Sequence, residues 1–171
     1  MQLQADRDFI TAALVELEDF LKSDQVHRLL PAVPGWPRLS LGALLLSQAR
    51  LTAAGEVLPA ELAQVLARRA ALVTRRAGQE LPQRIRQWVV FSQEVREEGV
   101  SRAEYAAAVA PRVMVTLLER ELRFPPPEVG RQLALADRRL EQLTRAGDFV
   151  WEPDLAAGFP PEQFWYLYRG W

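Results

Sequence analysis

The sequence contains no cysteine, and its only histidine is His27. Without thiols, the chain cannot form disulfides, thiolate zinc sites, iron–sulfur clusters or a cysteine nucleophile. A single histidine also excludes a zinc or iron site built from several histidines of one chain. We therefore predict that the protein holds no metal and uses no cofactor.

Long apolar runs and a strong net charge are also missing. No apolar run approaches the ~18 residues that a membrane-spanning helix needs. The N-terminal region is acidic, whereas a signal peptide begins with basic residues followed by apolar ones. The net charge is −1, so nothing attracts the chain as a whole to nucleic acid or acidic membranes. We expect a cytoplasmic protein without membrane contacts, with nucleic acid as its least favoured partner.

The sequence signatures of common enzyme sites are absent as well. The chain has no P-loop (G-x-x-x-x-G-K-[ST]), no dinucleotide-binding G-x-G-x-x-G and no G-x-S-x-G. Only scattered carboxylates and arginines are left as a source of catalytic groups. These absences favour a protein that is not an enzyme.

One stretch, residues 39–55, predicts the centre of the fold. Ser40 suits an N-cap and Gly55 suits the position just after the C-terminal end of a helix. Leucines and alanines of this segment point to nearly every side of a helical wheel, which is typical of a buried helix. We place Leu45 at the centre of the core and expect other helices to surround the helix 40–54.

Apolar residues at helical spacing predict further helices on both sides of this segment. Ser101 and Glu104 form an S-x-x-E capping box, and Pro111 should kink or split the helix that this box begins. The predicted helical segments are 6–22, a short piece over 23–30, 59–78, 82–98, 101–122, 127–147 and 162–169.

These segments predict an all-α fold, a single-domain multi-helix bundle of six or seven helices around the buried central helix. The chain of 171 residues is long enough for one domain with a sizeable core. We assign residues 1–147 to the bundle and residues 148–171 to an aromatic C-terminal arm of the same domain.

The arm concentrates the aromatic residues of the chain. Residues 149–171 hold 8 of its 15 aromatic side chains, and Trp and Tyr are favoured at protein interfaces. The arm can therefore contact a partner subunit, or it can fold back and cap its own bundle. The candidates for partner binding in the arm are Trp151, Phe159, Phe164, Trp165, Tyr168 and Trp171.

Arginines dominate the span from Arg68 to Arg86, where Glu80 is the only acidic residue. Arginines on one surface would bind phosphate well. However, two of them fall on the apolar stripe of the predicted helix 59–78, and buried arginines need carboxylate partners. We favour pairing with the acidic first helix, within the chain or across a dimer, and name Arg68 and Arg75 as further partner-binding candidates.

The opposite face of the predicted helix 59–78 carries small residues. Ala63, Ala67, Ala71 and Thr74 stand where an outer helix normally shows charge. This face indicates a second packing partner. With the acidic first helix, the basic span and the aromatic arm, it leads us to expect self-association, as a two-fold dimer.

Asp24 and His27 lie one helical turn apart in a D-x-x-H pattern. A carboxylate can orient an imidazole for base catalysis or metal binding. A partly exposed polar pair at a helix end explains the same residues without any catalysis. We keep His27 and Asp24 only as weak catalytic candidates.

Three functions are compatible with these features. The favoured one is a non-enzymatic helical interaction or assembly protein that self-associates. The alternative is a helical pocket protein that binds a small molecule, or an enzyme that uses carboxylates and arginines. The third is a nucleic-acid binder that uses the Arg68–Arg86 span.

Overall fold

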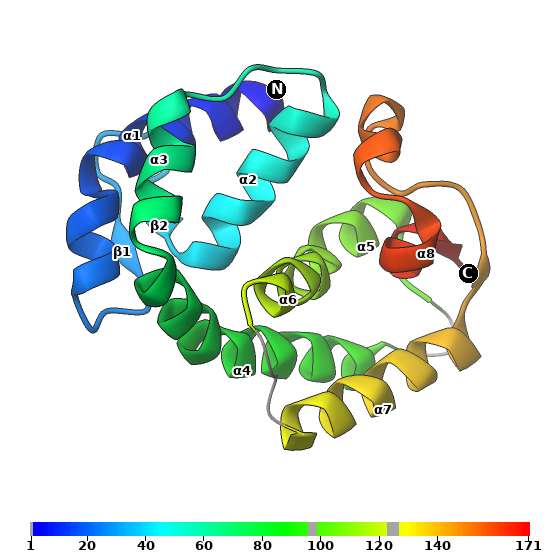
Figure 1. Cartoon of the computed structure of the whole chain (residues 1–171). Coiled ribbons are helices and arrows are strands. Elements are labelled where there is room, and N and C mark those ends of the chain that lie inside the picture. Colours follow the sequence, from blue (N-terminus) through cyan, green and yellow to red (C-terminus); the bar gives the residue numbers. More distant parts are fainter. Residues whose placement is uncertain (1, 96–98, 123–126) are drawn as a thin grey trace.

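The computed structural model describes residues 2–95, 99–122 and 127–171, and it confirms an all-α multi-helix fold (Figure 1). The eight α-helices of these residues are α1 (Gln2–Lys22), α2 (Leu41–Ala53), α3 (Ala60–Arg68), α4 (Ala70–Glu94), α5 (Arg102–Ala108), α6 (Ala110–Arg120), α7 (Pro127–Leu143) and α8 (Pro161–Phe164). The shorter elements are the 3₁₀ turns η1 (Pro153–Gly158) and η2 (Trp165–Tyr168) and the two-residue strands β1 (Arg28–Leu29), β2 (Arg38–Leu39), β3 (Arg145–Ala146) and β4 (Arg169–Gly170).

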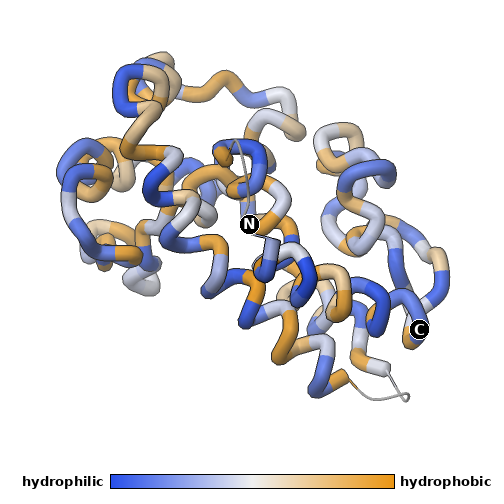
Figure 2. Tube along the Cα trace, turned by 60° about the horizontal axis from the view of Figure 1, so that its bottom comes forward, coloured by the Kyte–Doolittle hydropathy of each residue, from blue (hydrophilic) through white to orange (hydrophobic). Residues whose placement is uncertain are grey.

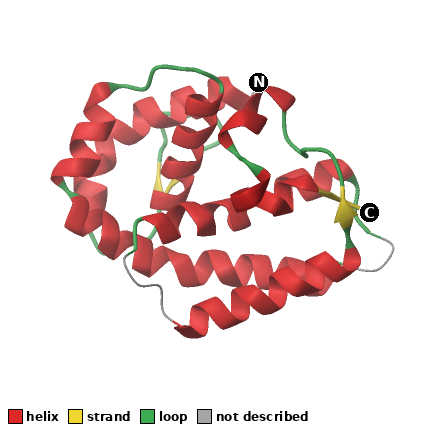
Figure 3. Ribbon diagram, turned by 45° about the vertical axis from the view of Figure 1, so that its right-hand side comes forward, coloured by secondary structure: helices red, strands yellow, loops and turns green. Residues whose placement is uncertain are grey.

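The longest helix, α4, connects the two ends of the molecule (Figure 1). Helices α1, α2 and α3 contact α4, and so do α6 and α7. Figure 3 shows the strands as two small patches at opposite ends of the helical assembly. Hydrophilic and hydrophobic residues alternate along the tube in Figure 2, as expected for amphipathic helices around a shared core.

Helix α2 begins as predicted, and a long-range contact supports its first turn. The Ser40 hydroxyl accepts the N–H of Ala43 at 3.2 Å. The buried Glu80 carboxylate of α4 accepts the Ser40 hydroxyl at 2.8 Å and the Gly42 N–H at 3.0 Å. A Cβ on Gly42 would lie 2.7 Å from the Glu80 Oε1, so a larger residue here would displace this carboxylate. Glu80 therefore caps α2, as a negative charge at a helix N-terminus should.

Leu45 is not at the centre of the core, contrary to our expectation. It is half-buried, whereas its neighbours Leu44 and Leu46 are buried. Helices α1, α4 and α6 together with η1 surround α2, but they leave one stripe of it partly uncovered.

The boundary between α3 and α4 differs from the predicted break over residues 79–81. The break falls at Arg69, whose N–H bonds the Val65 carbonyl at 3.0 Å, and α4 continues through Gly78 and Pro82. An interior proline costs about 3 kcal/mol. Packing of α4 against α6 and α7 outweighs this local penalty. The predicted end of helix 82–98 lies outside the described residues.

The prediction of a short helix over residues 23–30 is wrong. The chain leaves α1 at Lys22 and forms β1, which pairs antiparallel with β2, Arg28 opposite Leu39. Arg76 of α4 determines this exit, because its guanidinium donates to the Phe20 carbonyl and to the Gln25 carbonyl, both at 2.7 Å. A cation at the C-terminal carbonyls of α1 ends the helix favourably.

The aromatic arm folds back on its own bundle, which is the second of the two arrangements that the sequence left open. Strand β4 pairs with β3, and the Val150 N–H bonds the Leu167 carbonyl at 2.9 Å. Phe159, Phe164 and Tyr166 are buried in the hydrophobic core. Helix α7 accordingly ends at Leu143, earlier than predicted, because the next residues pair with the arm.

Within the described residues, no helix is both long enough and apolar enough to cross a membrane.

Candidate functional site

The two weak catalytic candidates, His27 and Asp24, form no hydrogen bond with each other in the described structure. His27 Nε2 is 2.9 Å from the Gln83 side-chain oxygen on α4, and Asp24 is exposed. Among the described residues, no group of three or more His, Asp or Glu side chains is placed to hold a metal ion.

The predicted arginine surface is engaged with α1. Arg68 and Arg69 contact the two carboxylate oxygens of Glu18, at 2.5 and 3.3 Å. Arg69 and then Arg68 hold the pKa of Glu18 below its usual range through these hydrogen bonds. Arg75 donates to the Leu21 carbonyl at 3.0 Å, beside the contacts of Arg76. These side chains hold the end of α1 within the chain, in line with the pairing that the sequence favoured.

The candidate residues of the arm divide into two groups. Trp151, Phe159 and Phe164 are buried in the chain's own core, and of these three only Trp151 lines a pocket described below. Trp165, Tyr168 and Trp171 are half-buried at its edge.

A buried polar cluster fastens the arm to the bundle. Arg112 of α6 binds Asp137 of α7 through two hydrogen bonds, Nε to Oδ1 at 3.0 Å and Nη2 to Oδ2 at 2.9 Å. The Trp88 indole donates to the same carboxylate at 2.8 Å, and the Arg112 guanidinium lies 4.4 Å from the centroid of the Tyr166 ring. Burial is the largest single effect and lowers the pKa of Arg112, but the hydrogen bond to Asp137 and the nearby charges of Tyr166, Asp137 and Glu119 together outweigh it, so the net shift is upward. The cluster joins α4, α6, α7 and η2.

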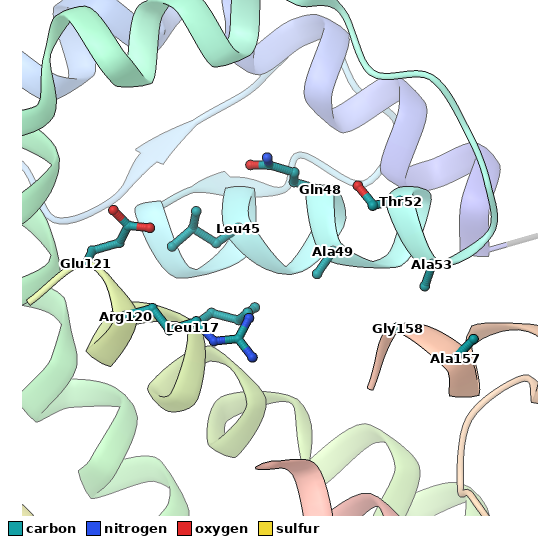
Figure 4. Close-up of a pocket in the computed structure, with 10 residues that line it drawn as sticks. All are labelled: Leu45, Gln48, Ala49, Thr52, Ala53, Leu117, Arg120, Glu121, Ala157 and Gly158. Carbon is teal, nitrogen blue, oxygen red and sulfur yellow. The ribbon is translucent and has the colours of Figure 1, made fainter. Parts of the chain in front are cut away.

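A pocket of about 510 Å³ lies along the uncovered stripe of α2, between α2, α6 and η1 (Figure 4). We call it the α2 groove. Its volume is in the range of small-molecule sites. The residues that line the α2 groove are Leu45, Gln48, Ala49, Thr52, Ala53, Leu117, Arg120, Glu121, Ala157 and Gly158.

The wall of the α2 groove follows helical geometry. The five α2 residues recur at three- and four-residue steps, so they form one continuous stripe. Figure 4 shows Ala49 and Ala53 on the side of α2 that faces α6 and η1. At the far end, Gly158 approaches α2 so closely that a Cβ on it would lie 2.4 Å from the Ala53 Cβ. The α2 groove is therefore closed at that end by a backbone contact.

Polar groups at the α2 groove are few. The side-chain oxygen of Gln48 is buried and accepts no hydrogen bond from residues 2–95, 99–122 or 127–171. Arg120 donates to the Gln163 side chain at 2.5 Å and lies 5.2 Å from the centroid of the Phe164 ring. Glu121 supplies the opposite charge in the lining, so the charged side chains of the α2 groove sum to zero.

Sequence reasoning missed the α2 groove because it treated α2 as covered on all sides. A signal was present in the stripe itself: Gln48, Thr52 and two alanines share it, whereas the leucines of α2 other than Leu45 lie elsewhere. A face with small and polar residues on an otherwise leucine-rich helix indicates the side that the fold leaves open.

Comparison with known proteins gave no relative: no protein-family model, no curated protein and no solved structure matches this sequence.

Proposed function

We propose that this chain is a non-enzymatic binding protein whose α2 groove takes a small, mostly apolar molecule. The observation that carries the proposal is the uncovered stripe on the central helix. A helix with this leucine content is normally covered on every side, yet here five residues of α2 border a pocket instead. The proposal includes the cytoplasmic location expected from the sequence.

The lining indicates the chemistry of the ligand. Leu45, Leu117 and the alanines offer an apolar surface, which favours a ligand with an apolar body. The charges of Arg120 and Glu121 cancel, which favours an uncharged ligand. We infer a mostly apolar, uncharged molecule.

Ligand-observed NMR with a library of uncharged fragment-sized molecules tests this proposal. Ala49→Trp places an indole in the α2 groove and should abolish binding of the hits. Ala134→Trp, at an exposed position of α7, is the matched control and should retain binding. The proposal fails if no fragment binds the wild-type chain, or if the hits bind the Ala49→Trp variant equally well.

Self-association is a second candidate function, and one observation favours it. Ala63, Ala67 and Ala71 are exposed on α3 and α4, so these three alanines are not covered by any of the described residues, whereas Thr74 of the same predicted face donates to the Glu121 carbonyl at 3.1 Å. We propose that this face pairs with a second copy in a two-fold dimer. Light scattering at micromolar concentration should give twice the monomer mass, and Ala67→Arg should restore the monomer. A monomer mass for the wild-type chain would rule this candidate out.

A further inference from the structure

A second cavity, of about 490 Å³, lies where α5 and the start of the arm meet α1 and α2. We call it the arginine pocket. Its charged side chains are Arg50, Arg102 and Glu152, and Gln2 adds an amide. Arg50 follows Ala49 by one residue and is therefore turned about 100° away from it on α2. The arginine pocket and the α2 groove are thus separate sites.

Arg50 is nearly buried but its donors are unused. Its side chain is 13% exposed, and it donates no hydrogen bond to any residue that the structure describes. Its guanidinium lies 4.4 Å from the centroid of the Trp151 ring, which fixes its position. Arg76 and Arg112 are buried, and the terminal nitrogens of both donate to groups within the chain, although Arg76 Nε has no partner among the described residues. A mostly covered arginine whose terminal donors are free at a cavity can bind an anion.

The nearest carboxylate does not satisfy Arg50. Asp6 Oδ1 lies 3.9 Å from Arg50 Nη1, which is too long for a hydrogen bond. That oxygen already accepts the Ser47 hydroxyl at 2.7 Å. Burial raises the pKa of Asp6, against the smaller opposing effects of Ser47, Arg50 and Gln2. The guanidinium fork of Arg50 is left for a ligand.

The rest of the arginine pocket selects among anions. Arg102 adds a second guanidinium and is held by its Nη2, which donates to the Phe149 carbonyl at 2.5 Å. Glu152 subtracts one charge, so the lining has a net charge of +1 and suits a monoanion better than a dianion. Trp151 and Ala107 provide an apolar surface beside the charges, and the Trp151 indole is fixed by donating to the Ala106 carbonyl at 2.8 Å.

We propose that the arginine pocket binds a small organic monocarboxylate, with the carboxylate on Arg50 and Arg102 and the apolar part on Trp151 and Ala107. A planar carboxylate matches the two parallel donors of a guanidinium. The size of the cavity admits a molecule of several carbon atoms beside the carboxylate. This inference does not depend on the function proposed for the α2 groove.

NMR titration with hexanoate tests the proposal, with the Trp151 indole N–H resonance as the local reporter. Trp151→Phe assigns that resonance. Hexanoate should shift this resonance saturably. The isosteric neutral hexanamide should bind at least about tenfold more weakly than hexanoate, since one charged hydrogen-bonding contact corresponds to roughly that ratio. Inorganic phosphate should bind more weakly than hexanoate.

Variants locate the site. Arg50→Gln should weaken hexanoate binding by about tenfold, and Arg102→Gln by several-fold, on the same principle. Glu152→Gln should strengthen hexanoate binding, because it removes a negative charge that repels the carboxylate of the ligand. Arg131→Gln, on the exposed surface of α7, and Ala49→Trp, in the α2 groove, should leave hexanoate binding unchanged.

Several results would overturn the proposal: no saturable shift, equal binding of hexanamide, tighter binding of phosphate, or full affinity in Arg50→Gln. Far-UV circular dichroism checks that Arg50→Gln is folded. If it is not, Arg102→Gln and Ala107→Trp, both at exposed positions, decide the matter, and unchanged affinity in both of these variants rejects the site.

Discussion

Arg112 with Asp137 and Arg50 with Asp6 are two arginine–aspartate pairs between helices. In both pairs the guanidinium lies 4.4 Å from the centroid of an aromatic ring near the C-terminus, Tyr166 in the first and Trp151 in the second. The first pair is closed by two hydrogen bonds of 2.9 and 3.0 Å. The second stays 3.9 Å apart, and the Asp6 Oδ2 is buried with no hydrogen bond from the described residues.

The difference shows that residue type does not decide what such a pair does. The Asp137 carboxylate also accepts the Trp88 indole N–H, so the guanidinium, the carboxylate and the indole of that cluster all have a partner within the chain. Arg50 belongs to the same kind of pair, but it lines a cavity and has donors that no described residue accepts. A completed pair stabilises the fold, and an incomplete one can bind a ligand.

Removing the aspartate of each pair should give the largest contrast. Asp137→Ala leaves a buried guanidinium and a buried indole N–H without an acceptor, and should cost about 3–5 kcal/mol of unfolding free energy. Asp6→Ala should cost about 1–2 kcal/mol, mainly through the Ser47 hydroxyl. Urea denaturation measures both. Equal losses would mean that the two pairs are energetically alike.

Double-mutant cycles sharpen the comparison. Arg112→Met combined with Asp137→Leu should show a coupling energy near 3 kcal/mol, the upper end of the range for residues in direct contact. Arg50→Met combined with Asp6→Leu should show less than about 1 kcal/mol, since the two groups are not hydrogen-bonded. A strong coupling in the second cycle would contradict the incomplete pairing.

The aromatic side of the Arg112 cluster contributes a smaller effect. The Tyr166 hydroxyl lies 2.7 Å from the Thr116 hydroxyl, and burial raises the pKa of Tyr166 to about 12, so the phenol stays protonated at neutral pH. Tyr166→Phe should cost about 1 kcal/mol in urea denaturation. Tyr168→Phe is the control: its hydroxyl donates to the Phe159 carbonyl at 2.9 Å at a half-buried position, where water can replace it, so the loss should be smaller. If Tyr166→Phe leaves the unfolding free energy unchanged, the hydroxyl does not contribute to the cluster.

The pH dependence of stability gives the smallest and most specific test. Burial raises the pKa of Asp6, so the folded state holds this proton more tightly than the unfolded state does. Stability due to Asp6 is therefore present below its unfolded pKa and is lost as the pH rises through the folded pKa. Asp6→Asn removes this loss.

The stability of Asp6→Asn relative to wild type should accordingly be higher at pH 7 than near pH 3.5. Urea denaturation at the two pH values measures the difference, in which the carboxylates common to both proteins, such as Glu18 and Glu56, cancel. A relative stability that falls from the lower to the higher pH would contradict a raised pKa.

Local signals in the sequence predicted the ends of several helices correctly. Ser40 caps α2, Ser101 and Glu104 form the capping box of α5, and Pro111 occupies the first turn of α6. Gly55 has a φ of +76°, as its place after α2 requires. Each of these features depends on residues within four positions of one another, which is why a sequence reveals them.

Long-range contacts defeated the local signals elsewhere. Ser23 suggested a helix start, but its hydroxyl bonds the Phe20 carbonyl at the end of α1, beside the Arg76 guanidinium from α4. Gly78 suggested a helix end, but α4 continues through Gly78 and Pro82 because it packs against α6 and α7. The contacts that decide these cases join segments far apart in the sequence, such as Arg76 and Ser23, which are 53 positions apart, and no short pattern encodes them.

By itself, the sequence determined the all-α class and the central place of α2, because both follow from the spacing of apolar residues and caps along single helices. Only the tertiary structure decided that the aromatic arm covers its own bundle, that one stripe of α2 stays open, and that Arg112 finds its aspartate while Arg50 does not. These outcomes depend on which side chains of distant helices meet, and the distances between those side chains exist only in the folded chain.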